Sequence, residues 1–342
     1  GGIEHIEAAE VPTPTPTDDE VLIRVATVAA NRQDINLILG RFVNPDLELP
    51  HILGIDPAGV AVEVGATVEH VAPGDRVVVK PPIACGECAA CRDGEDDACE
   101  LIRSVGIHRP GGMAEFVSVP ARNVFVLPDG LGFAEATAVA HSFPVALTLL
   151  RKARLQPDDT VLVSGASGAV GSATVQLART LGAQVIAGVG SDRGARWLAE
   201  LPAELAPELV IDYTTAPEFG GLIRQLRPAG VDVYVETASD PAVWTEALRV
   251  LARRARIAVI GAHAGPVVEI NNNWLFKQRV TIVGCSGSTL ASFADALAMV
   301  GDGRLVPNID SIFPVADAVD GYRRLMQRQN QGKVVLRVSE LV

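Results

Sequence analysis

The chain has 342 residues, of which 48% are hydrophobic and 20% are charged, a composition typical of a globular protein with a large buried core. This length predicts two domains, because a single hydrophobic core rarely serves more than about 250–300 residues. The formal net charge of −12 disfavours nucleic acids and anionic membranes as partners, since both require clustered lysine and arginine, and it favours a small-molecule substrate.

No uncharged apolar run reaches the roughly 18 residues that a membrane-spanning helix needs. The first residues also lack the basic-then-apolar pattern of a signal peptide. We therefore expect a cytoplasmic protein. Structural disulfides are rare in the cytoplasm.

The first part of the chain, up to about residue 140, combines short β-forming runs with many proline and glycine residues. This pattern predicts an irregular β-rich domain. Residues 21–25 and 76–80 are the clearest expected strands. The alternation of proline and threonine over residues 12–17 predicts an extended connector before the first of them.

From about residue 159 the pattern changes to strands that alternate with helices. A strand over residues 160–163 leads through a glycine-rich turn into a helix over residues 169–181, which Gly182 ends. The other expected strands are residues 184–187, 209–212, 231–236, 256–260 and 280–283, and the expected helices between them are residues 217–226 and 241–253. This alternation predicts a parallel, doubly wound sheet.

The end of the chain returns to the character of its beginning, with a helix expected over residues 290–300 and a strand over residues 333–338. We therefore predict an α/β protein in which one domain interrupts another. The β-rich domain takes residues 1–141 and 287–342, and the dinucleotide-binding domain takes residues 142–286.

The turn after residue 163 has the features of a dinucleotide-binding loop. Small residues let a pyrophosphate approach the backbone, and the N-terminus of the following helix attracts its negative charge. A tight turn that only packs the helix closely is the alternative. The cofactor-binding candidates in this turn are Gly165, Ser167, Gly168, Ala169, Val170 and Gly171.

The end of the second strand decides which dinucleotide fits. An acidic residue there would bind the ribose 2′-hydroxyl of NAD(H), but residues 187–189 contain no acid. Ser191, Arg193 and Arg196 follow, and these groups suit a 2′-phosphate, so NADP(H) is favoured over NAD(H). The alternative is that both arginines are solvated charges on a helix surface.

Cys85, Cys88, Cys91 and Cys99 lie within one short segment, the cysteine lobe (residues 85–99). Four thiolates close a tetrahedral zinc site and leave no open position, which predicts one structural zinc. An iron–sulfur cluster can use similar early spacing, but the ferredoxin pattern has a shorter last gap followed by proline.

Several segments resemble the medium-chain dehydrogenase/reductase superfamily, and the likeness covers nearly the whole chain. They are the glycine turn, the cysteine lobe, and residues 53–60, 73–77, 111–117 and 332–336. The resemblance implies an NAD(P)H-dependent oxidoreductase with a GroES-like catalytic domain split around a Rossmann domain and an active site in the cleft between them. It also implies a homodimer through the cofactor domain, where the strand over residues 280–283 would otherwise be an apolar sheet edge.

Zinc alcohol dehydrogenases of this superfamily hold a catalytic zinc through a cysteine, a His-Glu pair, and a later cysteine, aspartate or glutamate. At the matching positions this chain has Asn31, then Ile55 and Asp56, and then Ala140. A catalytic zinc usually needs three protein ligands, and Asp56 is the one candidate among these residues. The resemblance therefore implies that the catalytic metal has been lost although the structural one remains.

Residues 31–36 and 54–59 resemble the Asn-x-x-Asp and Gly-x-Asp-x-Ala-Gly segments of zinc-independent quinone oxidoreductases and enoyl reductases. Phe42 departs from the tyrosine that is the proposed proton donor of the mitochondrial-type enoyl reductases. Tyr213 matches a position beside the adenosine phosphate in this group. Gly261, after the strand over residues 256–260, completes the predicted cofactor-binding residues.

The catalytic candidates are Asn31, Asp56 and His141. Asn31 could donate a hydrogen bond to a substrate carbonyl or to the nicotinamide amide, and His141 could supply a proton. A lone histidine is more often structural, and Asp56 and Asp34 could instead anchor loops through backbone hydrogen bonds.

We expect hydride transfer from NADPH to an activated C=C of an enone, enoyl thioester or quinone, without a catalytic metal. A conjugated acceptor delocalises the negative charge that a metal would otherwise stabilise. One alternative is an alcohol dehydrogenase whose metal is held by unconventional ligands such as Asp56 and His141. Another is a family member that binds the nucleotide but has lost turnover.

Overall fold

The computed structural model describes residues 1–41, 47–261, 265, 267–328 and 330–341. The chain forms two compact units. Unit 1 contains Gly1–Pro144 and Ser288–Val342, and unit 2 contains Val145–Gly287. The sequence predicts the two changes of domain after residues 141 and 286.

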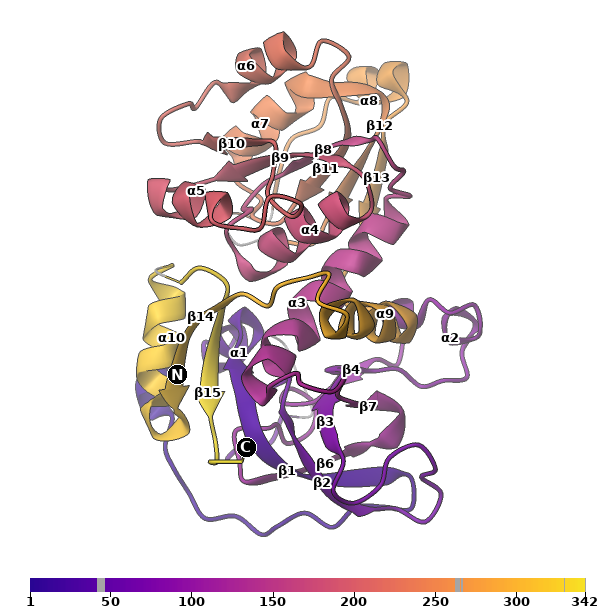
Figure 1. Cartoon of the computed structure of the whole chain (residues 1–342), viewed down its shortest axis with the longest axis vertical. Helices are drawn as coiled ribbons and strands as arrows, with labels where there is room; N and C mark the ends of the chain where they lie inside the picture. The colour runs from indigo at the N-terminus through magenta and orange to yellow at the C-terminus, as the bar shows by residue number, and fades with distance from the viewer. Residues whose placement is uncertain (42–46, 262–264, 266, 329, 342) are drawn as a thin grey trace. The chain divides into compact units, whose positions relative to one another are not determined.

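Unit 1 is built on a seven-stranded sheet in the order β14-β15-β1-β2-β3-β7, with β6 also paired to β1. Figure 1 shows β15 beside β1, although the two strands come from opposite ends of the chain. The strands are β1 (Glu20–Ala30), β2 (Ala58–Val64), β3 (Arg76–Val79), β6 (Phe116–Pro120), β7 (Val124–Val126), β14 (Ile309–Pro314) and β15 (Lys333–Arg337), with a separate pair of β4 (Pro82–Ile83) and β5 (Arg103–Ser104). The expected β-rich texture of this part is confirmed.

The register of β15 on β1 determines which side chains meet at one end of this sheet. The two strands are antiparallel, and Ala30 lies opposite Val334. Asn31 and Lys333 are the next residues beyond this pair, so the sheet brings the two ends of the chain together at that point.

Unit 1 contains several helices, one of which lies inside the cysteine lobe. They are α1 (Arg32–Ile38), α2 (Ala89–Arg92), α9 (Leu290–Gly301) and α10 (Ala318–Met326), with short 3₁₀ turns at η1 (Ile3–His5), η2 (Asp96–Ala98), η3 (Ala121–Asn123) and η4 (Val315–Asp317). The long helix α3 (Phe133–Lys152) contains the boundary after Pro144. Its length and composition would allow it to cross a membrane, but 83% of its most apolar window is buried, as in the core helix of a soluble protein.

Unit 2 is a six-stranded parallel sheet in the order β10-β9-β8-β11-β12-β13. The strands are β8 (Thr160–Val163), β9 (Gln184–Val189), β10 (Leu209–Asp212), β11 (Val231–Glu236), β12 (Leu251–Val259) and β13 (Thr281–Gly284), and the helices are α4 (Ala169–Thr180), α5 (Asp192–Ala199), α6 (Phe219–Leu226), α7 (Pro241–Val250) and α8 (Asn272–Gln278). The predicted doubly wound sheet is confirmed. Its strand order reverses between β8 and β11, the place where such sheets bind nucleotides.

The boundary between α7 and β12 differs most from the prediction. The helix expected to reach residue 253 ends at Val250, and β12 begins directly at Leu251, where the backbone is extended at φ −64° and ψ 137°. Arg254 adopts φ 68°, and the register on β11 shifts between Val231 and Val233. This irregularity lets the strand start early, although the arginine-rich segment has no strand pattern.

Candidate functional site

The glycine turn of unit 2 lies between β8 and α4, at the strand-order reversal. Gly165 adopts φ 62°, and a Cβ there would lie 2.5 Å from Thr237 Oγ1. A Cβ on Gly171 would lie 2.2 Å from the carbonyl oxygen of Gly165, so the first turn of α4 packs against the loop backbone. The first N–H groups of a helix have no intrahelical partner, and here they come at the edge of a tight glycine cradle. These residues fit a dinucleotide pyrophosphate.

Ser167 and the start of α5 lie close together beside this turn. A Cβ on Gly194, in the first turn of α5, would lie 2.8 Å from Ser167 Oγ. Ser191 caps the same helix, because its hydroxyl accepts a hydrogen bond from the Gly194 N–H at 3.2 Å. The structure therefore brings together two serines that the sequence predicts to bind the cofactor.

The arginines predicted to bind a 2′-phosphate lie on α5. Arg196 pairs with Asp192 at 2.9 Å, and their side chains are 72% and 74% exposed. An exposed pair of this kind contributes little to stability, so it does not prevent Arg196 from binding a phosphate. The strand β9 before this helix ends in Val189, and the first acidic residue after it is Asp192, at the start of α5.

Tyr213 and Gly261 lie along the same edge of the sheet. A Cβ on Gly188, in β9, would lie 1.8 Å from the Tyr213 hydroxyl, so the tyrosine would have to move to admit a side chain there. Burial raises the pKa of Tyr213, whose ring packs 5.3 Å from that of Phe219. A Cβ on Gly261 would lie 1.9 Å from the carbonyl oxygen of Thr237. Gly188 and Gly261 therefore let chain segments approach closely at the carboxyl end of the strands.

The cysteine lobe of unit 1 brings four sulfur atoms together. One ligand atom from each of Cys85, Cys88, Cys91 and Cys99 lies within 4.8 Å of the others. The sulfur of Cys91 lies 3.8 Å from that of Cys85 and 3.4 Å from that of Cys88. Tetrahedral zinc with bonds of about 2.3 Å requires sulfur separations of about 3.8 Å, so the lobe fits one structural zinc.

The protonation of the lobe supports the same conclusion. Backbone N–H groups of Glu87 and Cys88 donate to the sulfur of Cys85 and lower its pKa to about 6. Burial and the neighbouring thiols raise the pKa of Cys91 to about 12. The lowered pKa of Cys85 favours its thiolate, the form in which cysteine binds zinc.

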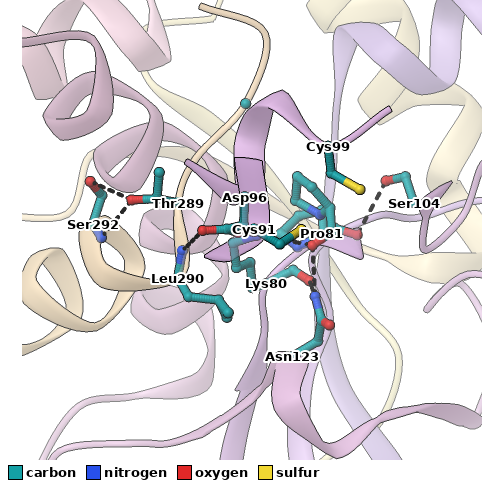
Figure 2. Close-up of polar contacts among 12 residues, drawn as sticks. Lys80, Pro81, Cys91, Asp96, Cys99, Ser104, Asn123, Thr289, Leu290 and Ser292 are labelled. Atoms are coloured by element: carbon teal, nitrogen blue, oxygen red, sulfur yellow. Dashed lines mark hydrogen bonds and ion pairs between the residues drawn. The ribbon is translucent and has the colours of Figure 1, made fainter. Parts of the chain in front are cut away.

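A buried ion pair anchors the lobe to the rest of unit 1 (Figure 2). The ammonium of Lys80 lies 3.0 Å from Asp96 Oδ2, and the two side chains are 1% and 8% exposed. Asp96 Oδ1 accepts the backbone N–H of Leu290 at 2.9 Å. These residues line a cavity of about 320 Å³ together with Cys91 and Arg122. Sequence reasoning missed this network, because its partners are widely separated along the chain.

Asn31 and Asp56, two of the predicted catalytic residues, lie in a closed cluster with Lys333. Asp56 is 0% exposed and accepts hydrogen bonds from Ala29 N at 3.0 Å, from Asn31 Nδ2 at 3.1 Å and from Lys333 Nζ at 3.0 Å. Asn31 Oδ1 accepts from the same ammonium at 2.5 Å. Lys333 is a polar member of the site that the sequence did not indicate.

A second buried carboxylate lies next to this cluster. Asp34 Oδ2 accepts the backbone N–H of Asn31 at 2.8 Å and the hydroxyl of Tyr322 at 3.0 Å. Burial raises the pKa of Asp34 to about 7, and the nearby Asp56 adds to this rise. The expectation that Asp34 anchors a loop agrees with its bond to the Asn31 backbone.

His141 lies in α3, beside the buried Ala140. Burial, and then the positive charge of Lys333, lower the pKa of His141 to about 4, whereas Asp56 acts in the opposite direction. His141 is therefore a neutral imidazole at physiological pH.

A catalytic metal does not fit these residues. Within the described part of the chain, the cysteine lobe is the one group of three or more His, Cys, Asp or Glu side chains that could hold a metal ion together. Ile55 and Ala140 are buried and apolar. A metal ion on Asp56 would have to displace the ammonium of Lys333, to which the carboxylate is already paired.

The split of unit 1 around a parallel nucleotide-binding sheet, together with the glycine cradle, defines a dinucleotide-dependent oxidoreductase. Comparisons with known proteins agree: residues 17–129 match the alcohol dehydrogenase GroES-like domain, and residues 169–302 match the zinc-binding dehydrogenase family. The chain belongs to the medium-chain dehydrogenase/reductase superfamily. It is an NAD(P)-dependent oxidoreductase.

Three relatives illustrate the range of the superfamily around this chain. A crystal structure of an NAD-dependent alcohol dehydrogenase superposes with a TM-score of 0.91 at 34% identity, covering 99% of this chain and 97% of that one. L-threonine 3-dehydrogenase of Pyrococcus abyssi is 30% identical over 96% of this chain and 94% of its own length. Acryloyl-coenzyme A reductase of Metallosphaera sedula is 26% identical over 98% and 97%. Dehydrogenases and a C=C reductase thus share the architecture of this chain.

Proposed function

We propose that the chain is an NADPH-dependent reductase that transfers hydride to the activated C=C of an enone, enoyl thioester or quinone without a catalytic metal. The observation that carries this proposal is the closed cluster of Asn31, Asp56 and Lys333, which occupies two of the positions where zinc ligands are expected. A conjugated acceptor needs less help from a Lewis acid than a plain ketone, because it delocalises the developing charge. The similarity to an acryloyl-coenzyme A reductase supports the same class of substrate.

In this proposal unit 2 binds NADPH, which supplies the hydride when bound. The glycine cradle at Gly165 and Gly171 takes the pyrophosphate, and the N-terminus of α4 faces its charge. Ser191, Arg193 and Arg196 take the 2′-phosphate, since no acid at the end of β9 competes for the ribose.

The proton that completes the reduction comes from solvent or from His141. With a pKa of about 4, His141 carries no imidazolium proton at neutral pH. This favours solvent as the source, with His141 as a neutral hydrogen-bonding group.

A substrate screen tests the proposal. We expect NADPH oxidation with α,β-unsaturated thioesters, cyclic enones or quinones, and no NADP⁺ reduction with simple secondary alcohols. The opposite pattern would favour the alcohol dehydrogenase alternative, which the similarity to alcohol and threonine dehydrogenases supports. Cofactor binding without turnover on any substrate class would favour a family member that has lost its activity.

We further propose a cytoplasmic homodimer that carries one structural zinc per chain. The terminal strand β13 of unit 2 is largely exposed, and Ile282 on it is 38% exposed. An apolar strand at a sheet edge is open to pairing with a second copy. Light scattering tests this, and a monomer at micromolar concentration would end the proposal of a dimer.

A further inference from the structure

Lys333 is a buried cation to which the roles described above assign no task. It is 4% exposed, and its ammonium lies 2.5 Å from Asn31 Oδ1 and 3.0 Å from Asp56 Oδ2. Burying an ammonium costs much free energy unless it is paired and hydrogen bonded. This chain meets both conditions with two residues that the family resemblance placed at the catalytic centre.

The position of the ammonium corresponds to that of a missing cation. Asn31 stands where the resemblance places the first metal ligand, and Ile55 and Asp56 stand where it places the His-Glu pair. Oxygen atoms of Asn31 and Asp56 converge on a single ammonium. A fixed positive charge is therefore present between these positions without a metal ion.

The ammonium is able to act beyond its two partners. An ammonium has three hydrogens, and the bonds to Asn31 and Asp56 engage two of them. Its charge also acts on His141 in α3. There it is the second cause, after burial, of the lowered pKa of the imidazole. Lys333 therefore influences the electrostatics of every catalytic candidate in unit 1.

We propose that the ammonium of Lys333, fixed by Asn31 and Asp56, replaces the lost metal as the permanent positive charge of the reaction site. This inference rests on the reductase function proposed above. As hydride adds with its electron pair to the β-carbon of the acceptor, the π electrons of the C=C move toward the carbonyl oxygen. A proton from solvent then adds to the α-carbon. The fixed charge stabilises the negative oxygen, and Lys333 keeps all of its own protons.

A purely structural role for Lys333 makes a different prediction. In that role it only ties the start of β15 to α1 and to the segment before β2, and removing the whole ion pair should restore a normal protein. In our proposal the positive charge itself is needed, so removing the pair restores the fold but not turnover.

The experiment compares Lys333→Met, Asp56→Asn and the double variant, with kcat, KM, the Kd for NADPH and the melting temperature as readouts. We expect kcat of the double variant to lie on the order of 10² below that of Asp56→Asn, because Asp56→Asn alone still has the lysine charge. The melting temperature of the double variant should exceed that of Lys333→Met, which leaves a buried carboxylate unpaired. Lys333→Arg should recover most of kcat because it retains the charge.

A double variant with wild-type kcat would overturn the proposal in favour of the structural role. A weakened NADPH Kd with unchanged kcat would also overturn it and make Lys333 a cofactor ligand. The matched control is Lys80→Met with Asp96→Asn, which removes the other buried lysine–aspartate pair at the same 3.0 Å separation. This control should retain kcat, because it removes a buried pair outside the proposed reaction site.

A separate readout distinguishes failure of this inference from failure of the proposed function. If the wild-type chain reduces no conjugated acceptor, the proposed function fails, but the effect of the charge is still measurable at His141 by NMR titration of its ring. Lys333→Met should raise the pKa of His141 from about 4 toward its ordinary value. An unchanged His141 titration would show that the charge does not act at the site and would overturn the inference.

Discussion

Asp96 accepts the backbone N–H of Leu290 at 2.9 Å, which joins the cysteine lobe to the first turn of α9. Its other carboxylate oxygen is paired with the buried Lys80. A carboxylate at a helix N-terminus also interacts favourably with the helix dipole. Asp96 therefore connects the lobe to α9, the first helix after the chain re-enters unit 1.

We predict that Asp96→Ala lowers the free energy of unfolding of unit 1 by about 3–5 kcal/mol, because it leaves the Lys80 ammonium buried without its partner. Denaturant unfolding measures this loss, and hydrogen exchange should show faster exchange in the first turn of α9. The control is Asp96→Asn, which can still accept the Leu290 N–H. It should protect the first turn of α9 from hydrogen exchange better than Asp96→Ala does. Equal exchange in both variants would contradict the role of this hydrogen bond.

We predict one zinc per chain, because the four sulfur atoms of the cysteine lobe lie within 4.8 Å of one another and can share one tetrahedral ion. Elemental analysis should give one zinc for the wild type and none for the variant with Cys85→Ser and Cys88→Ser. Cys285→Ser, which lies outside the lobe, should retain the metal. Two tightly bound zincs, or zinc that survives the double substitution, would rule out this assignment.

We predict tighter binding of NADPH than of NADH, since β9 ends without an acid and Arg193 and Arg196 follow it. Replacing both arginines by alanine should weaken NADPH binding by on the order of tenfold to a hundredfold and leave NADH unchanged, as expected for lost charge-assisted hydrogen bonds. Fluorescence titration of both cofactors measures this. The control is Arg227→Ala. Arg227 is the C-terminal cap of α6 and pairs with Glu208. Equal affinities in the wild type would count against the assignment.

We predict that Asp34 makes the stability of the chain fall as the pH rises from about 4 to about 7. Burial raises the pKa of Asp34 to about 7 from 3.8, so between these values the folded state binds more protons than the unfolded state. Stability is then present below the unfolded pKa and is lost as the pH approaches the folded one. Asp34→Asn should remove this pH dependence. In the wild type it amounts to as much as a few kcal/mol in the free energy of unfolding over the interval. Denaturant unfolding at several pH values tests it, and an identical slope in the variant would refute it.

The sequence predicted the architecture well where local patterns decide it. The strand over residues 160–163 and its glycine turn are confirmed, because Gly165 needs a positive φ and Gly171 a close packing contact that few other residues permit. The four cysteines lie close enough along the chain to be read as one site. By contrast, the early start of β12 at Leu251 depends on a register shift against β11, which no local pattern encodes.

The partners of the candidate site could not be predicted in the same way. Lys333 looked like part of a terminal strand, and its contact with Asn31 spans 302 positions of sequence. The antiparallel pairing of β15 on β1 creates that contact, so it is a consequence of tertiary structure. The same holds for the approach of Tyr322 to Asp34. Phe42, where the resemblance departs from a family tyrosine, lies outside the described residues.

The most direct test of the account is the rate of NADPH-dependent reduction of an α,β-unsaturated thioester by enzyme whose zinc content is counted in the same sample. We predict full activity at one zinc per chain, with that zinc assigned to the lobe by its loss in the variant with Cys85→Ser and Cys88→Ser. A chelator that leaves the lobe filled should not change the rate. Loss of activity on chelation with the lobe still filled, restored by added zinc, would contradict the metal-free mechanism and support an alcohol dehydrogenase.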